Sequence, residues 1–151
     1  MVSEINIRRA TAADVGPIVA MLADDPLGRS RESPDDLTPY ERAFARVDAD
    51  PDQLLAVADD DGEVVGTLQL TFIPGLSRQG ATRALIEAVR VRADRRGDGL
   101  GGTLVKWAID AARRRDCVLV QLTSDASRTA AHRFYLRLGF EQSHLGFKLA
   151  L

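Results

Sequence analysis

The chain has 151 residues, of which 45% are hydrophobic, and its formal net charge is −2. A chain of this length buries about two-thirds of its unfolded surface, which predicts a single domain over residues 1–151. The weak acidic balance gives no basic field for a nucleic-acid backbone, so we expect no nucleic-acid partner. No run of about 18 apolar residues and no signal-like start occurs, so we expect a cytoplasmic protein without a membrane partner.

The cysteine and lysine contents point to a bacterial protein of a reducing compartment. The single cysteine, Cys117, allows no internal disulfide and no cysteine-rich zinc site, so we expect no metal. It lies at a predicted helix-to-strand turn with no base nearby in the sequence, which favours a semi-buried thiol over a nucleophile. Of 20 basic residues only Lys106 and Lys148 are lysines, a bias typical of GC-rich bacterial genomes.

The N-terminal part is predicted to form a strand and two helices. Polar and apolar residues alternate around Ile5 and Ile7, and Thr11 to Asp14 resembles a capping box that starts a first helix. The polar stretch Asp24 to Thr38 predicts a connection, after which Pro39 suits the first turn of a helix that runs to Val47.

The middle of the chain is predicted to form three successive antiparallel strands. Leu54 to Ala58 and Glu63 to Phe72 flank an Asp-Gly step that favours a hairpin turn. A loop from Pro74 to Ala81 follows, and Arg83 to Arg92 then alternates like a long strand with both faces used.

The C-terminal part is predicted to alternate helices and strands. A helix from about Gly101 to Arg115 precedes a buried strand, Val118 to Thr123, and a helix from Arg128 to Leu138 that Gly139 ends. Phe140 to Leu151 then supplies one or two closing strands. The fold class is therefore α/β, with a mixed sheet of six to seven strands flanked by about four helices.

The glycine-rich turn from Arg96 to Gly102 is the feature with the clearest chemistry. It connects the long strand directly to a helix, so its free backbone N–H groups lie at the positive end of the helix dipole. Any Cβ would hold an anion away from these amides, and positions with positive φ also favour glycine. The turn therefore predicts a phosphate-binding site.

Several ligands are compatible with such a turn. Gly97-x-Gly99-x-x-Gly102 also fits the dinucleotide fingerprint, with Asp125 as the ribose-binding acid, but only 26 residues follow Asp125, too few for the further βα units. A nucleotide-hydrolysing loop is disfavoured because Thr103, and not lysine, follows the last glycine. A turn without a ligand is disfavoured by the entropic cost of so many glycines.

Two motifs in the same order resemble those of the GCN5-related N-acetyltransferase (GNAT) family. The Arg-x-x-Gly-x-Gly motif of the family is matched by Arg96, Gly99 and Gly101. About thirty residues later, Ala131 to Phe140 resembles the second signature, a helix carrying Phe-Tyr followed by Gly-Phe. The resemblance covers nearly the whole chain and is weakest over Asp24 to Asp50.

The resemblance implies a GNAT fold and an enzyme that transfers an acetyl group from acetyl-CoA to a primary amine of a small molecule or peptide, by direct attack in a ternary complex. It implies that the strand carrying Val89 to Val91 pairs with the pantetheine arm in a splayed gap beside the next strand. Ser127 replaces an asparagine that is common in the family, and still donates and accepts hydrogen bonds. The implied cofactor-binding residues are Val89, Arg90, Val91, Arg96, Gly97, Asp98, Gly99, Leu100, Gly101, Gly102, Ser127, Ala131, Phe134 and Tyr135.

The chemistry of the transfer selects two catalytic candidates. An amine with a pKa of about 10 is mostly protonated at neutral pH, so a base is needed, and Glu87 on the long strand is the candidate. A rim position or a salt bridge remains an alternative for Glu87. Tyr135 is the candidate donor of a proton to the leaving thiolate. A strand amide near Val89 is expected to stabilise the oxyanion.

The acceptor side carries fewer signals. Tyr40, Phe44 and His144 are candidate substrate residues, and His132 is expected on a helix surface. An acidic cluster is expected at the acceptor entrance, where it attracts a cationic amine: Asp24, Asp25, Glu32, Asp35 and Asp36. Two alternatives stay open, a non-catalytic acyl-CoA-binding sensor or interaction module, and a homodimer built by exchange of the closing strands.

Overall fold

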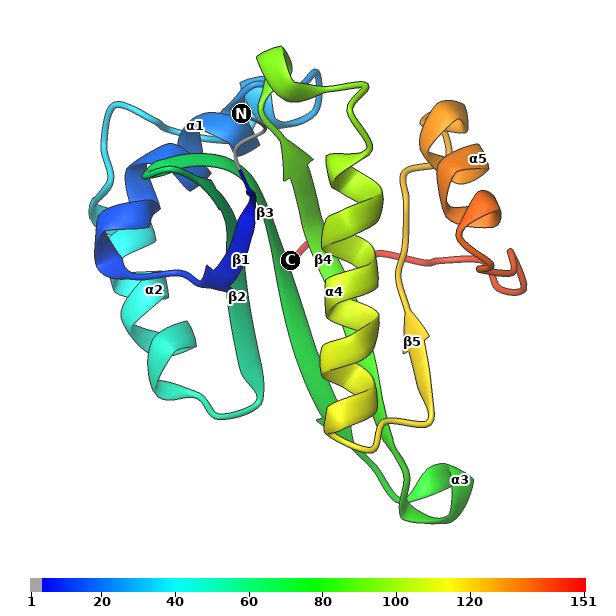
Figure 1. Ribbon diagram of the computed structural model, residues 1–151. Helices are drawn as coiled ribbons and strands as arrows, with labels where there is room; N and C mark the ends of the chain where they lie inside the picture. The colour runs from blue at the N-terminus through cyan, green and yellow to red at the C-terminus, as the bar shows by residue number, and fades with distance from the viewer. Residues whose placement is uncertain (1–3) are drawn as a thin grey trace. The chain divides into compact units, whose positions relative to one another are not determined.

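The computed structural model describes residues 4–151, which form two compact units, one up to Gln121 and one from Leu122 to Leu151. The first unit contains a five-stranded sheet with the spatial order β1-β2-β3-β4-β5 (Figure 1). Its elements are β1 Asn6–Arg9, α1 Val15–Ala23, α2 Thr38–Ala49, β2 Gln53–Asp60, β3 Glu63–Pro74, α3 Ser77–Gly80, β4 Thr82–Val91, α4 Leu100–Arg114 and β5 Leu119–Gln121. The short 3₁₀ turns are η1 Ala12–Asp14, η2 Gly28–Ser30 and η3 Ala93–Arg95.

The sheet is mixed, because β1 to β4 are antiparallel neighbours and β5 joins β4 in parallel. The pairing of β4 with β5 is short and runs only from Arg83 opposite Leu119 to Leu85 opposite Gln121. Beyond Leu85, β4 has no strand partner on this side among residues 4–151. The half of β4 that contains Val89 to Val91 therefore has an open edge, as the family resemblance implies.

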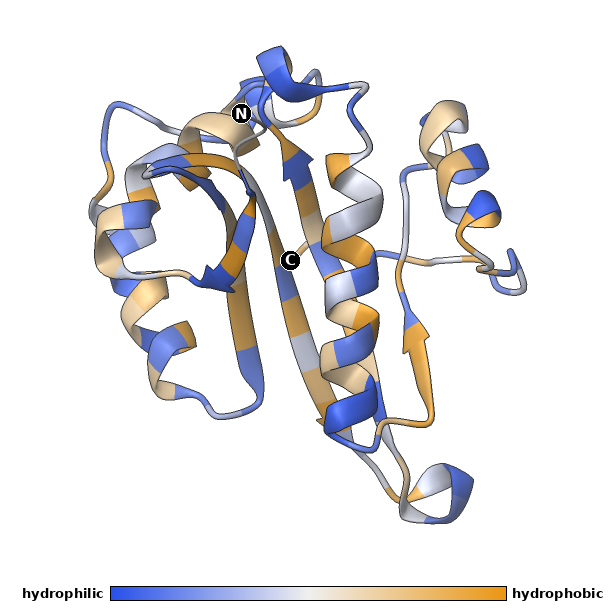
Figure 2. Ribbon diagram, viewed as in Figure 1, coloured by the Kyte–Doolittle hydropathy of each residue, from blue (hydrophilic) through white to orange (hydrophobic). Residues whose placement is uncertain are grey.

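The helices of the first unit cover both faces of the sheet. Helix α4 packs on β3 and β4, while α1 and α2 pack on β3 and β2 from the other face. Figure 2 shows the apolar residues of β2 to β4 between these helices. The packing against α4 is close at Gly66, where an added Cβ would lie 2.8 Å from a methyl carbon of Leu104. This close approach explains a glycine in the middle of a strand.

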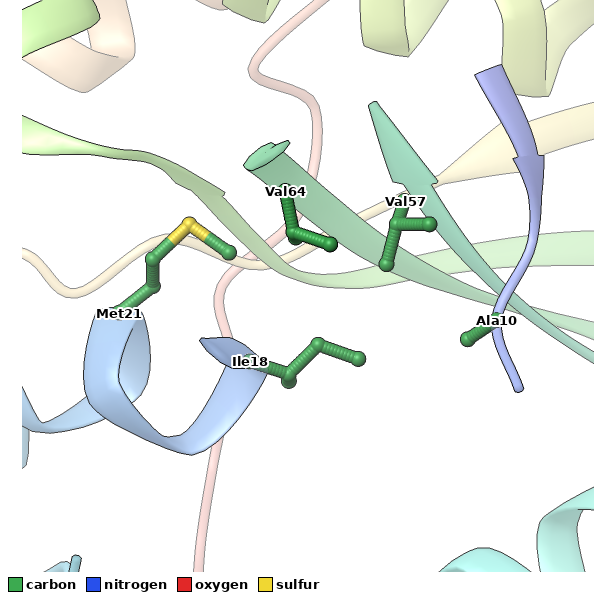
Figure 3. Packing of buried hydrophobic residues seen from close by; sticks show 5 residues of the cluster. All are labelled: Ala10, Ile18, Met21, Val57 and Val64. Carbon is green, nitrogen blue, oxygen red and sulfur yellow. The ribbon is translucent and has the colours of Figure 1, made fainter. Parts of the chain in front are cut away.

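A second apolar cluster lies under α1. Ile18 and Met21 point from this helix toward Val57 of β2 and Val64 of β3, with Ala10 at the end of β1 (Figure 3). The helix is preceded by the capping-box contact that the sequence predicts, because the Thr11 amide donates to the Asp14 carboxylate at 2.7 Å.

The second unit contains helix α5, Thr129–Arg137, and the extended C-terminal segment, which we define as residues 141–151. None of the residues from Leu122 to Leu151 is buried. Helix α5 ends in a Schellman motif in which the Gly139 amide donates to the Leu136 carbonyl at 3.0 Å and the Phe140 amide donates to the Tyr135 carbonyl at 3.1 Å. Gly139 has a φ of 99°, which explains a glycine at this position.

The order of elements agrees with the sequence prediction up to α5. The hairpin and the main helices are confirmed within a few residues of the predicted bounds. Two predictions were wrong. Val118 to Thr123 forms a strand only over Leu119–Gln121, and Phe140 to Leu151 forms no strand, so the described residues contain five strands and not six or seven.

Candidate active site

The glycine turn between β4 and α4 has the geometry of an anion-binding cradle. Gly97 and Gly99 have φ angles of 91° and 80°, and Gly99 is the N-cap residue of α4. The first amide after the turn with a backbone partner is that of Thr103, which donates to the Gly99 carbonyl at 3.1 Å. Among residues 4–151, the amides of residues 97–102 have no hydrogen-bond partner and no side chain caps the helix. These amides are therefore available to an anion at the positive end of the α4 dipole.

The turn also leaves room for a ligand. An added Cβ at Gly97 or Gly99 would meet no heavy atom within 4 Å. Gly62 in the hairpin between β2 and β3 is open in the same way, so the open space admits a ligand and the free amides are what distinguish this turn. The diphosphate group of coenzyme A fits this combination of free amides, open space and a helix N-terminus.

The side chains of the two arginines beside the turn are both held by contacts within the protein. Arg95 forms an ion pair with Asp60 at the end of β2. Arg96 instead donates through Nε to the Val91 carbonyl at 3.2 Å, which holds the turn against the end of β4. Arg96 of the family motif therefore stabilises the entry to the cradle through its side chain, in addition to any contact with a phosphate.

Strand β4 contains a bulge beside its open edge. Gln69 pairs with Glu87 and Thr67 pairs with Arg90, so Ala88 and Val89 together face the single residue Leu68. Ala88 has a φ of 54°, which is unusual for a residue other than glycine. The bulge is typical of a functional site, because it changes the direction of the side chains around it.

The bulge changes which side chains share a face. Strict alternation predicts Glu87 and Arg90 on opposite faces of β4. Cross-strand partners point to the same side, and Thr67 and Gln69 are two residues apart, so Glu87 and Arg90 share one face. Glu87 is exposed. The Glu87 side chain is therefore not buried among the apolar residues of the strand.

An apolar cavity of about 140 Å³ lies on this face, between the sheet and helices α1 and α2. The helices contribute Tyr40 and Phe44 to its lining, and the sheet contributes Thr67, Gln69 and Ala88. Two of the three predicted substrate residues therefore line one cavity, and Gln69, the cross-strand partner of Glu87, lines it too.

The connection after α1 is fixed to β4 by an ion pair that sequence reasoning missed. Asp25 Oδ2 lies 2.7 Å from Arg90 Nε, and both side chains are largely buried. Asp25 also accepts a hydrogen bond from the Gly28 amide at 2.5 Å. Partial burial raises the pKa of Asp25, but the Gly28 amide and the Arg90 guanidinium outweigh this effect and hold the pKa below its usual value.

This ion pair corrects the prediction that Asp25 adds negative charge at the acceptor entrance, because the charge of Asp25 is balanced by Arg90.

A second link in the same connection involves Tyr40. Its hydroxyl donates to Glu32 Oε1 at 3.1 Å and accepts a hydrogen bond from the Ser33 amide at 2.8 Å. No sequence pattern indicated either link, because each joins segments that local periodicity does not relate.

In the second unit, the aromatic signature forms a compact cluster. The Tyr135 ring lies edge-on to Phe134 at a centroid distance of 5.0 Å and edge-on to Phe140 at 5.8 Å. The contact between Phe140 and Tyr135 is the apolar contact that accompanies a Schellman motif. The Gly-Phe pair of the signature therefore has a structural role, which is to end α5 and hold the tyrosine ring.

The other predicted residues of the second unit make local contacts. The Ser127 hydroxyl donates to Asp125 at 2.6 Å, so only its acceptor capacity remains for a ligand. Hydrogen bonds from the Ser127 hydroxyl and amide lower the pKa of Asp125. The His132 ring contacts the Asp125 carbonyl at 2.8 Å, and His144 is exposed with its ring 2.6 Å from the Ser143 hydroxyl. Ala131 lies half-buried on α5.

Cys117 and the acidic residues provide no alternative centre. Burial raises the pKa of the Cys117 thiol, which disfavours the thiolate form that a nucleophile needs. Within residues 4–151, no three His, Cys, Asp or Glu side chains are grouped so that they could hold a metal ion. Over the same residues, no helix combines the length and apolar character needed to cross a membrane.

The fold and the glycine cradle define an acyl-CoA-binding protein with a mixed sheet opened beside a bulged strand. A family model described as the acetyltransferase (GNAT) family matches residues 18–140. The chain belongs to this family and is an acetyl-CoA-dependent N-acetyltransferase. The dinucleotide alternative for the glycine turn is thereby excluded.

Three known proteins illustrate the similarity. The aminoalkylphosphonate N-acetyltransferase of Salmonella typhimurium is 32% identical over 145 residues, which cover 96% of this chain and 90% of the relative. The L-methionine sulfoximine/L-methionine sulfone acetyltransferase of Pseudomonas aeruginosa is 29% identical over 142 residues, which cover 91% and 81%. A solved structure described as a transcriptional regulator from Bacillus halodurans is 47% identical, with a TM-score of 0.94 and coverage of 98% and 100%.

Proposed function

We propose that the chain acetylates the primary amine of a small molecule that also carries an oxidised phosphorus or sulfur group. Aminoalkylphosphonates, methionine sulfoximine and methionine sulfone, named for the two curated relatives, share this chemistry. Each combines an amine with a tetrahedral phosphorus or sulfur centre whose oxygens accept hydrogen bonds. The acceptor is thus a compact polar molecule with a short apolar stem, and a peptide is the less favoured acceptor.

The cavity beside the β4 bulge carries this proposal. Its volume of about 140 Å³ is close to that of engineered cavities that hold one benzene-sized guest, roughly 150 Å³. Phe44 and Leu22 supply apolar walls for a stem. Gln69 supplies a polar side chain at the sheet, and because its Nε2 donates to Gln53 Oε1, its own oxygen is the atom that remains for an acceptor. Such a volume suits a small amine and is too small for several residues of a polypeptide.

Residues of the chain are available for two parts of acetyl-CoA, the diphosphate and the pantetheine arm. We propose that the amides of residues 97–102 bind the diphosphate and that the open edge of β4 from Val89 to Val91 binds the pantetheine arm. Ser127, Ala131 and Phe134 of the second unit complete the proposed cofactor contacts. Acetyl-CoA supplies an acetyl group activated as a thioester.

Three groups of the chain have separate roles in the proposed reaction, as base, oxyanion donor and proton donor. Glu87, exposed beside the bulge, accepts a proton from the ammonium group of the acceptor, directly or through water, so that the neutral amine attacks. An amide of the bulge near Val89 donates to the oxyanion. The Tyr135 hydroxyl then donates a proton to the departing thiolate sulfur. Each group acts on a different atom of the reaction.

A non-catalytic acyl-CoA sensor is the second candidate. The name of the Bacillus halodurans structure, a transcriptional regulator, favours a regulatory role for a chain of high similarity. A sensor binds acetyl-CoA and releases no thiol with any amine. The presence of both Glu87 and Tyr135 favours the enzyme.

The deciding experiment measures release of free coenzyme A thiol from acetyl-CoA with a panel of amines. We expect the highest kcat/KM with aminoalkylphosphonates or with methionine sulfone and sulfoximine, and lower values with polyamines, aminoglycosides and peptides. Glu87→Gln is expected to lower the rate near neutral pH and to remove a limb of its pH profile, because the base is lost. Glu63→Gln, which changes an exposed glutamate on β3, is the matched control.

Two outcomes would contradict the proposal. A preference for peptides or polyamines would refute the proposed acceptor class. Binding of acetyl-CoA without thiol release for any amine would favour the sensor.

We further propose that the reaction takes place in a bacterial cytoplasm, where acetyl-CoA is formed. We also propose that both units belong to one N-acetyltransferase domain, because the family match spans them.

A further inference from the structure

Gln69 of β3 belongs to a polar cross-strand network on the face of the sheet where the cavity lies. Its Nε2 donates to Gln53 Oε1 at 2.8 Å, and the Thr71 hydroxyl donates to the same oxygen at 3.0 Å. Gln53 pairs directly with Thr71 and is the diagonal neighbour of Gln69, a separation that long side chains span. One side-chain oxygen of β2 therefore accepts both hydrogen bonds.

This network fixes the orientation of the Gln69 amide group. A glutamine side chain has two N–H donors and one carbonyl oxygen. Because Gln53 Oε1 is an acceptor only, it selects the Nε2 side of Gln69 and leaves Oε1 on the other arm of the planar amide. Within residues 4–151, no group donates to Gln69 Oε1. A hydrogen-bond acceptor is thus held in a fixed orientation on a residue that lines the cavity.

The two hydroxyl groups of the cavity lining already donate within the protein. The Thr67 hydroxyl donates to the Ala56 carbonyl at 2.8 Å, and Thr67 is only 1% exposed. The Tyr40 hydroxyl donates to Glu32 and also accepts a hydrogen bond from a backbone amide. Gln69 Oε1 is therefore the side-chain atom of the lining that is best placed to accept a hydrogen bond from a ligand.

Gln69 also lies directly opposite Glu87 in the pairing of β3 with β4. Directly opposite residues of an antiparallel pair point to the same face and have Cβ atoms roughly 5 Å apart. The Glu87 carboxylate and the Gln69 carbonyl oxygen are therefore within reach of hydrogens on a single amine nitrogen. The bulge at Ala88 follows at the next residue of β4.

We propose that Gln69 Oε1 accepts a hydrogen bond from the amine nitrogen of the acceptor and orients it for attack, with Gln53 as the positioning residue. The inference rests on the proposed acetylation of an amine with Glu87 as the base. An ammonium group has three N–H donors. After Glu87 has accepted one proton, the neutral amine keeps two N–H donors and a lone pair. One N–H stays on Gln69 Oε1, which restricts the directions in which the lone pair points.

The first test compares binding of aminoethylphosphonate and ethylphosphonate, which differ by the amine, in the presence of coenzyme A. Gln69→Leu keeps a side chain of similar size and removes the hydrogen-bond acceptor. In calorimetric titration, we expect the affinity for aminoethylphosphonate to fall about tenfold and the affinity for ethylphosphonate to change less than about twofold. Equal changes for the two ligands would mean that Gln69 only shapes the cavity, which would overturn the proposal.

The second test examines the orientation of Gln69 by changing Gln53. Gln53→Leu removes the acceptor that holds Nε2, so kcat/KM for the amine should fall about fivefold or more. Gln53→Glu keeps an oxygen that accepts both hydrogen bonds and should retain most of the wild-type value. Equal kcat/KM values in the two variants would refute the positioning role of Gln53.

The pH profile separates Gln69 from the base. Gln69→Leu should lower kcat/KM across the profile and keep the limb expected for Glu87, because the carboxylate is still present. Loss of this limb in Gln69→Leu would mean that the variant disturbs the base, and it would overturn the proposed role of Gln69.

Failure of this inference is distinguishable from failure of the proposed function. Absence of thiol release with every amine of the panel would refute the enzyme and this contact with it. Thiol release by wild type together with an undiminished kcat/KM in Gln69→Leu would refute the contact alone. If the panel shows a preferred amine other than aminoethylphosphonate, that amine and its deaminated analogue form the pair for the binding test.

Discussion

Each unit of the molecule contains one of the two GNAT motifs, and the two motifs are held in place in different ways. The glycine turn of the first unit lies between β4 and α4, whose Ile86, Leu104 and Val105 are almost fully buried. The aromatic signature of the second unit lies on α5, and no residue from Leu122 to Leu151 is buried. Packing therefore preorganises the glycine turn, the proposed phosphate site, whereas the Tyr135 ring contacts Phe134 on its own helix and Phe140 just after it.

This contrast separates two physical requirements of the reaction. About thirty residues without a buried core gain little hydrophobic free energy to offset the entropy of ordering the chain, so we expect the second unit to be the less stable of the two. Changes in the first unit should mainly alter stability and cofactor affinity. Changes in the second unit should mainly alter turnover. The following variants test this division, from the largest expected effect to the smallest.

The largest effect is expected for Tyr135→Phe. Loss of the hydroxyl removes the proposed proton donor, so kcat should fall by about 100-fold or more. The ring keeps its edge-on contacts with Phe134 and Phe140, so the dissociation constant for acetyl-CoA should change less than about twofold. Steady-state kinetics and calorimetric titration give the two values.

Tyr40→Phe is the matched control, because Tyr40 is the other tyrosine of the chain. It removes a hydroxyl that links Glu32 and Ser33 near the proposed acceptor cavity. We expect a rise in KM for the amine of a few-fold and little change in kcat. Equal kcat values for Tyr135→Phe and wild type would refute the role of Tyr135 and the assignment of turnover to the second unit.

The next effect concerns the cradle and compares Gly99→Ala with Gly62→Ala. Both glycines have positive φ, 80° and 91°, and an added Cβ would meet nothing within 4 Å at either. Each alanine should lower the free energy of unfolding by about 1 kcal/mol, because a Cβ is strained in this conformation. Only Gly99→Ala should also weaken acetyl-CoA binding, by about tenfold, since its Cβ enters the space proposed for the diphosphate. If calorimetric titration finds equal acetyl-CoA affinities for the two variants, the proposal that the diphosphate binds at this turn would be refuted.

The features of the sequence that predicted the structure well are local ones. The helical spacing of Leu104, Val105 and Ala108 predicted α4, and the Asp-Gly step predicted the hairpin between β2 and β3. The spacing of glycines predicted the free amides of the turn, because only backbone conformation and helix direction are needed to place them. The free amides of the turn were therefore predictable from about seven consecutive residues.

The features that the sequence did not predict depend on distant partners. The bulge at Ala88 has no glycine to mark it, so regular alternation along β4 placed Glu87 and Arg90 on the wrong relative faces. The ion pair of Asp25 with Arg90 joins segments that no local pattern relates. The alternation of residues 145–151 predicted a strand that the structure does not contain, because alternation alone makes no strand without a partner edge.

A smaller effect is expected for Asp14→Asn in the first unit. Arg8 donates two hydrogen bonds to the buried Asp14 carboxylate, at 2.7 and 3.1 Å. These bonds from Arg8 lower the pKa of Asp14, so the stabilisation is fully present above the unfolded pKa of about 3.9 and is lost as the pH falls through the lower folded value. We expect Asp14→Asn to cost about 2 kcal/mol at pH 7 and to reduce the fall in stability below about pH 4.

Urea unfolding between pH 2.5 and 7 gives the required free energies. Asp110→Asn is the control, because its ion pair with Arg113 is exposed on both sides and contributes little. If Asp14→Asn and Asp110→Asn cost the same at pH 7, the Arg8 contact would not stabilise the first unit. A pH dependence below pH 4 that is unchanged in Asp14→Asn would assign acid unfolding to other carboxylates.

The smallest effect on whole-protein stability is expected for Gly139→Ala, which acts on the second unit alone. The φ of 99° is strained for alanine, so the end of α5 should open more often, by roughly tenfold for a local cost of about 1.4 kcal/mol. Hydrogen exchange of the Gly139 and Phe140 positions should accelerate by this factor, while the amides of α4 exchange as in wild type. Gly80→Ala, at a φ of 76° in the first unit, should leave exchange in α5 unchanged. Because the Schellman motif holds Phe140 against Tyr135, kcat should fall a few-fold in Gly139→Ala and stay constant in Gly80→Ala. Faster exchange in α5 with unchanged kcat would mean that ligands and partners, and not the local motif, position the tyrosine.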